Sequence, residues 1–146
     1  MGKYQFAMLK ALGGEMLEVR EGYASAELPL SERVMQPTRV FHAGAITTLA
    51  DEVASAAIVG GPCDPEEMKG KAFPYSIQLS INLLSNDPVG PLRAEARVVK
   101  RGRVTVVDTE VKTSAGKTAA LMRSSHLMVD PAREGPHRNQ SRAAGN

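Results

Sequence analysis

The spacing of apolar residues along the chain predicts one long central helix, residues 40–59, between two groups of strands. Apolar side chains recur there every three or four positions, as on the faces of a helix packed in a core: Ile46, Leu49, Ala50, Val53, Ala57 and Ile58. Gly60-Gly61-Pro62 follows and ends the helix. The many alanines in this helix allow a neighbouring element to approach it closely.

Shorter elements precede the central helix. Residues 4–12 carry apolar side chains at helical spacing and stop at Gly13-Gly14, which predicts a short helix. Residues 15–20 and 23–30 flank Glu21-Gly22 and predict a hairpin. The loop that follows contains Pro37 and leads into the central helix.

After Ala72 the apolar positions alternate with a period of two, which predicts four long strands: 73–85, 90–102, 103–114 and 117–130. Because the turns between them are short, we expect consecutive strands to be antiparallel neighbours. One buried helix and a curved antiparallel sheet form an α+β architecture. We expect a single domain over residues 1–130 and a flexible tail over residues 131–146.

Composition and charge exclude several function classes. The tail holds three arginines and one glutamate, which account for the whole net charge of +2, so residues 1–130 are neutral and do not suggest a nucleic-acid interface. No apolar run approaches the roughly eighteen residues of a membrane span, and no secretory signal is evident. The single cysteine, Cys63, excludes an internal disulfide and favours a cytoplasmic setting.

The start of the central helix carries the strongest chemical signal. His42, Ala43 and Gly44 stand where backbone amides are free to bind an oxyanion, and Asp51 follows further along the same helix. A carboxylate can act on a bound carbonyl as a nucleophile or as a base that activates water. This combination predicts chemistry on an acyl group.

The order hairpin, loop, H-x-G-x6-D helix and long strands resembles the hotdog-fold acyl-CoA thioesterases, and most closely their PaaI-like group, which includes the mammalian acyl-CoA thioesterase 13 type. The basic turn 100–103 adds to the resemblance, which covers roughly residues 10–130. It implies a long helix wrapped by a curved antiparallel sheet of about five to six strands. It also implies hydrolysis of an acyl-CoA to a free acid and coenzyme A, with no metal or redox cofactor.

The resemblance assigns the matching acid, Asp51, the role of general base or nucleophile. It assigns the amide that follows His42 to polarisation of the thioester carbonyl. Ala43 stands where the family usually has glycine, but alanine keeps the N–H and costs nothing if the residue is helical. From the residues alone, Asp51 on a solvated helix face and His42 as a capping histidine remain alternatives. Glu52 is expected to be solvated or in a salt bridge.

Further site residues follow from the resemblance. Gln36 matches an amide that holds the carbonyl or the attacking water, although a loop glutamine is often only surface. Ser55 and Thr47 share the helix face of Asp51, and Ser76 matches a serine that some members contribute. For these hydroxyls, ordinary packing is the alternative.

Three cations surround Gly102 at a strand turn: Lys100, Arg101 and Arg103. The resemblance sets this turn near the phosphates of coenzyme A, whereas a basic hairpin tip also serves solubility. No metal site is expected, since His42, His126 and His137 have no mutual ligand spacing.

The resemblance also implies a homodimer, paired again into a tetramer, in which Asp51 of one subunit works with the helix-start amides of the other. The acyl group stays open between aryl-acetyl, aromatic and medium-chain aliphatic. Two alternatives to a thioesterase are a non-catalytic acyl-CoA-binding hotdog protein and a hotdog dehydratase. The H-F-P-x-x-P-G pattern of one dehydratase group is absent from the chain.

Overall fold

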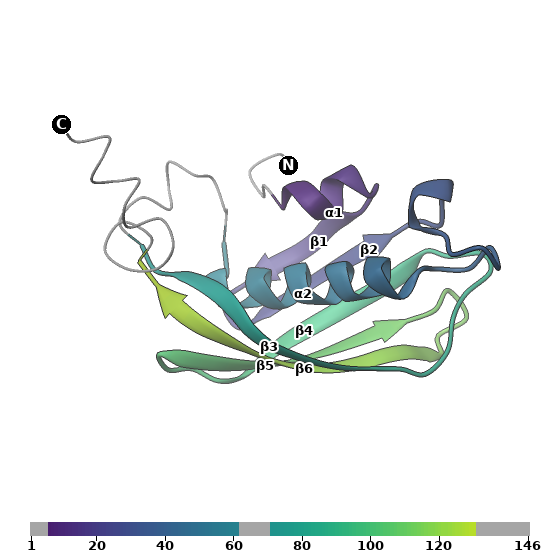
Figure 1. Ribbon diagram of the computed structural model, residues 1–146. Helices are drawn as coiled ribbons and strands as arrows, with labels where there is room; N and C mark the ends of the chain where they lie inside the picture. The colour runs from purple at the N-terminus through teal and green to yellow at the C-terminus, as the bar shows by residue number, and fades with distance from the viewer. Residues whose placement is uncertain (1–5, 62–70, 131–146) are drawn as a thin grey trace.

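A computed structural model describes residues 6–61 and 71–130, and it has one long helix packed on one face of a curved antiparallel sheet (Figure 1). The long helix is α2 (Ala43–Val59), and the short helix α1 (Ala7–Ala11) lies on the same side of the sheet. The six strands are β1 (Glu15–Arg20), β2 (Tyr23–Leu28), β3 (Phe73–Leu83), β4 (Leu92–Lys100), β5 (Val104–Lys112) and β6 (Thr118–Val129). A 3-10 turn, η1 (Glu32–Val34), precedes α2. This is the α+β hotdog architecture that the sequence predicts.

Small side chains let the sheet curve closely around α2. On the sheet, four alanines are fully buried against the helix: Ala24 and Ala26 of β2, and Ala94 and Ala96 of β4. On the helix, Leu49 and Val53 are fully buried among further alanines. Because interiors pack to the density of organic crystals, a larger residue at an alanine position would push the two layers apart.

The strand order β1-β2-β4-β5-β6-β3 corrects one prediction. Consecutive strands β4, β5 and β6 are neighbours as expected, but β3 pairs with β6 instead of β4. The link from β3 to β4 is eight residues, 84–91, rather than a tight turn. From β3 the link must pass β6 and β5 to reach β4, which is three strand spacings or about 14 Å, and eight residues can span this distance. As a result β3 is an edge strand.

The central helix begins at Ala43, three residues later than predicted. Phe41 is held in extended backbone, since its N–H donates to Asn86 Oδ1 at 3.0 Å and its C=O accepts from Asn86 Nδ2 at 2.9 Å. It also forms an isolated bridge with Met35. These bonds use the backbone groups that a longer helix would need.

The remaining elements agree with the predictions within a few residues. The predicted hairpin is β1 and β2, although β2 ends at Leu28. Within residues 6–61 and 71–130, no helix is long and apolar enough to cross a membrane. The predicted tail 131–146, with His137, and Cys63 lie outside the described residues.

The link between β3 and β4 is fastened by the buried carboxylate of Asp87. Its Oδ1 accepts the amides of Val89 and Gly90, each at 2.8 Å, and its Oδ2 accepts the amide of Ser114 at 2.6 Å. Burial alone would raise the pKa of Asp87, but the amides of Gly90, Ser114 and Val89 hold it well below its usual range. The carboxylate therefore ties the link to the β5–β6 turn.

We expect Asp87→Asn to lower the free energy of unfolding by about 1–3 kcal/mol at pH 7. The side-chain NH₂ of the asparagine would face a backbone N–H, and two donors cannot form a hydrogen bond. Since the carboxylate stabilises the fold only while ionised, the deficit should shrink as the pH falls below about 4. Chemical denaturation at several pH values measures both effects. Asp108→Asn, which removes an exposed ion pair with Arg123, is the control and should cost less than about 1 kcal/mol. Equal losses in the two variants would contradict the prediction.

Candidate active site

Asp51 lies in an open cleft between α2 and the edge strand β3. The cleft has a volume of about 410 Å³, within the range of small-molecule sites. Three of the six Phe and Tyr residues of the chain, Phe6, Phe73 and Tyr75, line it together with Glu52, Ser55, Pro74 and Ser76. The structure thus brings Asp51 together with two of the predicted hydroxyls, those of Ser55 and Ser76.

Asp51 begins a series of hydrogen-bond contacts that leads into the sheet. The Ser76 hydroxyl donates to Asp51 Oδ1 at 2.6 Å, and Ser76 Oγ also lies 3.2 Å from His126 Nδ1. On the other side of the ring, Ser124 Oγ lies 2.8 Å from His126 Nε2. His126 is fully buried. Burial lowers the pKa of His126, while the charge of Asp51 acts in the opposite direction.

A β-bulge turns Ser76 toward Asp51. The register between β3 and β6 shifts between Ser76 and Gln78, after Ser76 has paired with His126. Beyond the bulge, Leu79 pairs with Ser124, whose side chain is buried, so the odd-numbered residues of β3 face the helix there. If β3 alternated strictly backward from Leu79, without a bulge, Ser76 would face outward. Bulges often re-aim a side chain beside an active site in this way.

Glu52 is only half-exposed and forms no salt bridge with the described residues, which differs from the sequence prediction of a solvated or ion-paired side chain. It is half-buried in the cleft beside Asp51, and its Oε2 accepts the amide of Leu9 in α1 at 3.1 Å. Burial raises the pKa of Glu52 to about 6, the amide of Leu9 opposes this, and the nearby charge of Asp51 adds to it.

The start of α2 offers one free amide. His42 is the N-cap, and its Nδ1 accepts the amide of Gly44 at 2.8 Å, so this amide is not available to a ligand. A Cβ on Gly44 would lie 3.1 Å from the same nitrogen, which explains the glycine. The Ala43 amide donates to no acceptor in the described part of the chain. Ala43 is the first helical residue, so alanine in place of glycine introduces no strain.

Ala43 borders a second cleft of about 310 Å³, again a size that suits a small molecule. Gln36 lines this cleft, and its amide donates to Thr38 Oγ1 at 2.7 Å. Leu83, the last residue of β3, lines this cleft together with Leu84 and Ser85, which follow the strand. Thr47 lines neither cleft; its hydroxyl donates to the carbonyl of Ala43 at 2.8 Å.

The two clefts are too far apart to act on one thioester within a single chain. Ala43 and Asp51 are eight residues apart in α2, which corresponds to about 12 Å along the helix axis. A carbonyl oxygen on the amide and a water on the carboxylate must both lie within about 3 Å of their partners.

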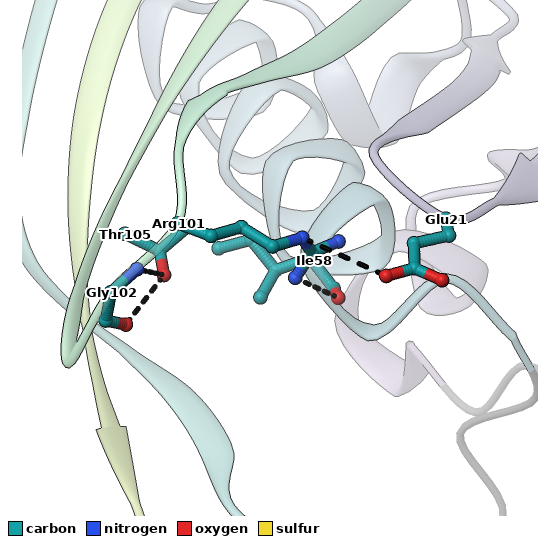
Figure 2. Close-up of polar contacts among 5 residues, drawn as sticks. All are labelled: Glu21, Ile58, Arg101, Gly102 and Thr105. Carbon is teal, nitrogen blue, oxygen red and sulfur yellow. Dashed lines mark hydrogen bonds and ion pairs between the residues drawn. The ribbon is translucent and has the colours of Figure 1, made fainter.

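The basic turn lies at the opposite end of α2 (Figure 2). Arg101 donates from a terminal guanidinium nitrogen to the carbonyl of Ile58 at 3.2 Å, and its Nε lies 3.9 Å from Glu21 Oε1. The hydroxyl of Thr105 accepts from the amide of Gly102 and donates to its carbonyl, which shapes the turn. Arg101 therefore caps the helix C-terminus, where a cation is favoured. Lys100 and Arg103 are exposed beside it.

A further hollow of about 510 Å³ lies on the sheet face opposite the helix and does not include Asp51. Arg123 holds Asp108 there in a bidentate pair, with both N–O distances at 2.7 Å. Glu95 and Glu110 also line this hollow, and they lie 3.7 Å from Arg93 and 3.3 Å from Lys112, so each of its carboxylates is paired with a cation. No group of three potential metal ligands occurs in residues 6–61 and 71–130.

The fold defines a class: a hotdog protein, in which one long helix is wrapped by a curved antiparallel sheet. The sequence model described as "Thioesterase superfamily" matches residues 39–120, more than half of the chain. The chain belongs to this superfamily and is a thioester hydrolase, as its resemblance to the family implies.

Known proteins of this kind are similar over most of the chain. A proposed esterase of Archaeoglobus fulgidus is 31% identical over 125 residues, 84% of this chain and 75% of the relative. A 1,4-dihydroxy-2-naphthoyl-CoA hydrolase of Listeria monocytogenes is 26% identical over 98 residues, 67% and 75% of the two chains. The PaaI protein of E. coli, from the phenylacetic acid degradation operon, superposes with a TM-score of 0.72 at 24% identity and covers 86% of each chain.

We expect Glu52→Gln to stabilise the protein at pH 7.5 but not at pH 4.5. The folded state disfavours the ionised Glu52, so its cost appears as the pH rises from about 4.5 to about 6. Glutamine keeps an oxygen for Leu9 and should gain roughly 1 kcal/mol at pH 7.5, after discounting for partial exposure.

Thermal unfolding of both proteins at the two pH values measures this gain. Glu15→Gln, at an exposed position of β1, is the control. A gain for Glu52→Gln that does not change with pH would contradict the prediction.

Proposed function

We propose that the protein is an acyl-CoA thioesterase, which converts an acyl-CoA and water to a carboxylic acid and coenzyme A. The observation that carries this proposal is the 2.6 Å hydrogen bond from Ser76 to Asp51 Oδ1 in an open, aromatic-lined cleft. It holds one oxygen of the carboxylate still. The name of the Listeria relative, a CoA thioester hydrolase, supports the choice of coenzyme A as the leaving group.

Asp51 provides the general base or the nucleophile in this reaction. Its Oδ1 is engaged by Ser76, while Oδ2 makes no hydrogen bond with any of the described residues. Oδ2 takes the proton of a water that attacks the thioester carbon, or attacks that carbon itself. The C–S bond then breaks and coenzyme A leaves as its thiolate, which takes up the proton from water. In the nucleophile route an acyl-aspartyl anhydride forms first, and water then hydrolyses it to the free acid and restores Asp51.

A homodimer completes the site. Among the described residues, nothing pairs with the outer edge of the eleven-residue strand β3, and a long open edge is a template for strand pairing. If β3 pairs antiparallel with its copy about a two-fold axis, its first residues lie beside the last residues of the partner's β3. The first residues border the Asp51 cleft and the last border the Ala43 cleft. One chain's carboxylate then meets the partner's Ala43 amide. Two such dimers pair to form the tetramer.

In this arrangement the partner's Ala43 amide polarises the thioester carbonyl. His42 supports this polarisation with the hydrogen on its Nε2. Its Nδ1 accepts the amide of Gly44, so a neutral ring carries its hydrogen on Nε2. The amide of Gln36 lies in the same cleft. Antiparallel pairing brings the C-terminus of one α2, with the basic turn 100–103 beside it, near the N-terminus of the partner's α2. The phosphates of coenzyme A therefore lie at this turn.

The first test is release of coenzyme A across a panel of aryl-acetyl, aromatic and aliphatic acyl-CoAs. We expect turnover of at least one class, and a fall in kcat of about 10²- to 10⁴-fold for Asp51→Asn, as for loss of a general base. Binding of acyl-CoA, measured by calorimetry, should persist in the variant. Full activity of Asp51→Asn, or binding without turnover by the wild type, would overturn the proposal; the latter fits a non-catalytic acyl-CoA-binding protein.

The oxyanion amide can be removed with little effect on the fold. Proline suits the first position of a helix, and His42 already has the extended backbone that precedes proline. We expect Ala43→Pro to lower kcat by about 10²- to 10³-fold, as for loss of one oxyanion donor. Ala43→Gly, which keeps the N–H, is the matched control and should remain active.

The same variants test the shared site. A heterodimer of one Asp51→Asn chain and one Ala43→Pro chain, purified with two different tags, has one intact site if each site spans two chains. It should therefore recover about half of the wild-type activity, given two equivalent sites. If each site lies within one chain, the heterodimer will be as inactive as its parents.

A further inference from the structure

We infer that His126 is a positioning residue for Asp51. It donates its Nδ1 hydrogen to Ser76 Oγ, which directs the Ser76 hydroxyl hydrogen onto Asp51 Oδ1. The inference extends the proposed function, because it assigns the orientation of the catalytic carboxylate to a buried histidine on the far strand of the β3–β6 pair.

The first support is the register of the sheet. His126 and Ser76 are direct partners across β3 and β6, and Thr105 of β5 is the partner of His126 on its other side. The ring is fully buried, so it has no alternative partner in solvent. Its two nitrogens are both within hydrogen-bond distance of a serine oxygen, at 3.2 Å from Ser76 and 2.8 Å from Ser124.

The direction of each hydrogen bond follows from what each group can donate. An ionised carboxylate only accepts, so the single hydroxyl hydrogen of Ser76 must point to Asp51. Ser76 Oγ can then only accept from His126, which puts the ring hydrogen on Nδ1. Nε2 is left as an acceptor for the Ser124 hydroxyl. All four residues are satisfied by this one arrangement.

The surroundings keep the ring neutral. Burial lowers the pKa of His126, and Asp51 on α2 is the charged group that opposes this effect. The other elements packed against the ring present hydroxyls, those of Ser76 on β3, Thr105 on β5 and Ser124 on β6 itself. A neutral ring has one N–H, and the contacts decide which nitrogen carries it.

This arrangement differs from a Ser-His-Asp triad. In a triad the histidine lies between serine and acid and takes the serine proton. Here the serine lies in the middle and donates to the acid. His126 therefore does not activate Ser76 as a nucleophile; it fixes the direction of its hydroxyl. If the hydrogen were on Nε2, Ser76 could donate to Nδ1 instead, and Asp51 would lose its orienting bond.

Two amide variants separate the two nitrogens of the ring. In His126→Asn the side-chain nitrogen is as many bonds from Cα as Nδ1, so it can donate to Ser76. In His126→Gln the amide reaches the place of Nε2 and loses the bond to Ser76. We expect kcat for acyl-CoA hydrolysis to stay within about threefold for Asn and to fall about tenfold or more for Gln, the range for loss of one hydrogen bond.

KM should change little in either variant, because orienting the carboxylate serves the chemical step rather than binding. Thr109→Val, at a buried β5 hydroxyl without a hydrogen-bond partner in the described residues, is the control and should keep wild-type kcat. Equal kcat for the Asn and Gln variants, or a loss that appears only in KM, would overturn the inference.

A second measurement does not depend on activity. Long-range ¹H–¹⁵N NMR spectra of the wild-type protein at pH 7.5 report which ring nitrogen of His126 carries hydrogen. We expect the neutral form protonated at Nδ1; protonation at Nε2, or a charged ring, would overturn the inference. If the wild type hydrolyses no acyl-CoA, the proposed function fails, and the NMR result still decides whether His126 orients Ser76.

Discussion

Close packing of α2 against the curved sheet is the constraint on which the other features depend. Alanines on β2 and β4 meet alanines on the helix, so the two layers approach nearer than larger residues would permit. This approach brings a helix-borne carboxylate, Asp51, within a hydrogen bond of Ser76 on the sheet. The contact joins α2 to the edge strand β3, whose residues follow Asp51 by about 25 positions in the sequence.

The second constraint is the position of β3 at the edge of the sheet. Both clefts that carry the proposed chemistry, one with Asp51 and one with Ala43, open beside this strand at its two ends. The helix fixes their separation, which is far too large for one thioester to bridge. The chain therefore presents two complementary half-sites along one unpaired edge, which is the geometry that antiparallel pairing with an identical strand can use.

Periodicity and local chemistry predicted the helix, the hairpin and the N-cap role open to His42, and the structure confirms these three; the role of Asp51 stays a prediction. These patterns could not predict which strands pair when the strands are far apart in the sequence. Consecutive order suggested β3 beside β4, because nothing local records that β3 closes against β6. Strict alternation would have put Ser76 on the outer face with Gln78, and only the bulge turns it inward. His126 carried one signal, since it shares the inward face of β6 with Ser124.

The amide of Asn86 has a consequence for how assembly and catalysis are linked. Asn86 lies three residues after the end of β3 and hydrogen-bonds both backbone groups of Phe41, next to the capping residue of α2. A displacement of the segment that follows β3 would therefore move Phe41 through the Asn86 side chain, and with it the residues that orient the Ala43 amide. If the chain assembles through β3 as proposed, strand pairing and the orientation of that amide would be coupled through Asn86.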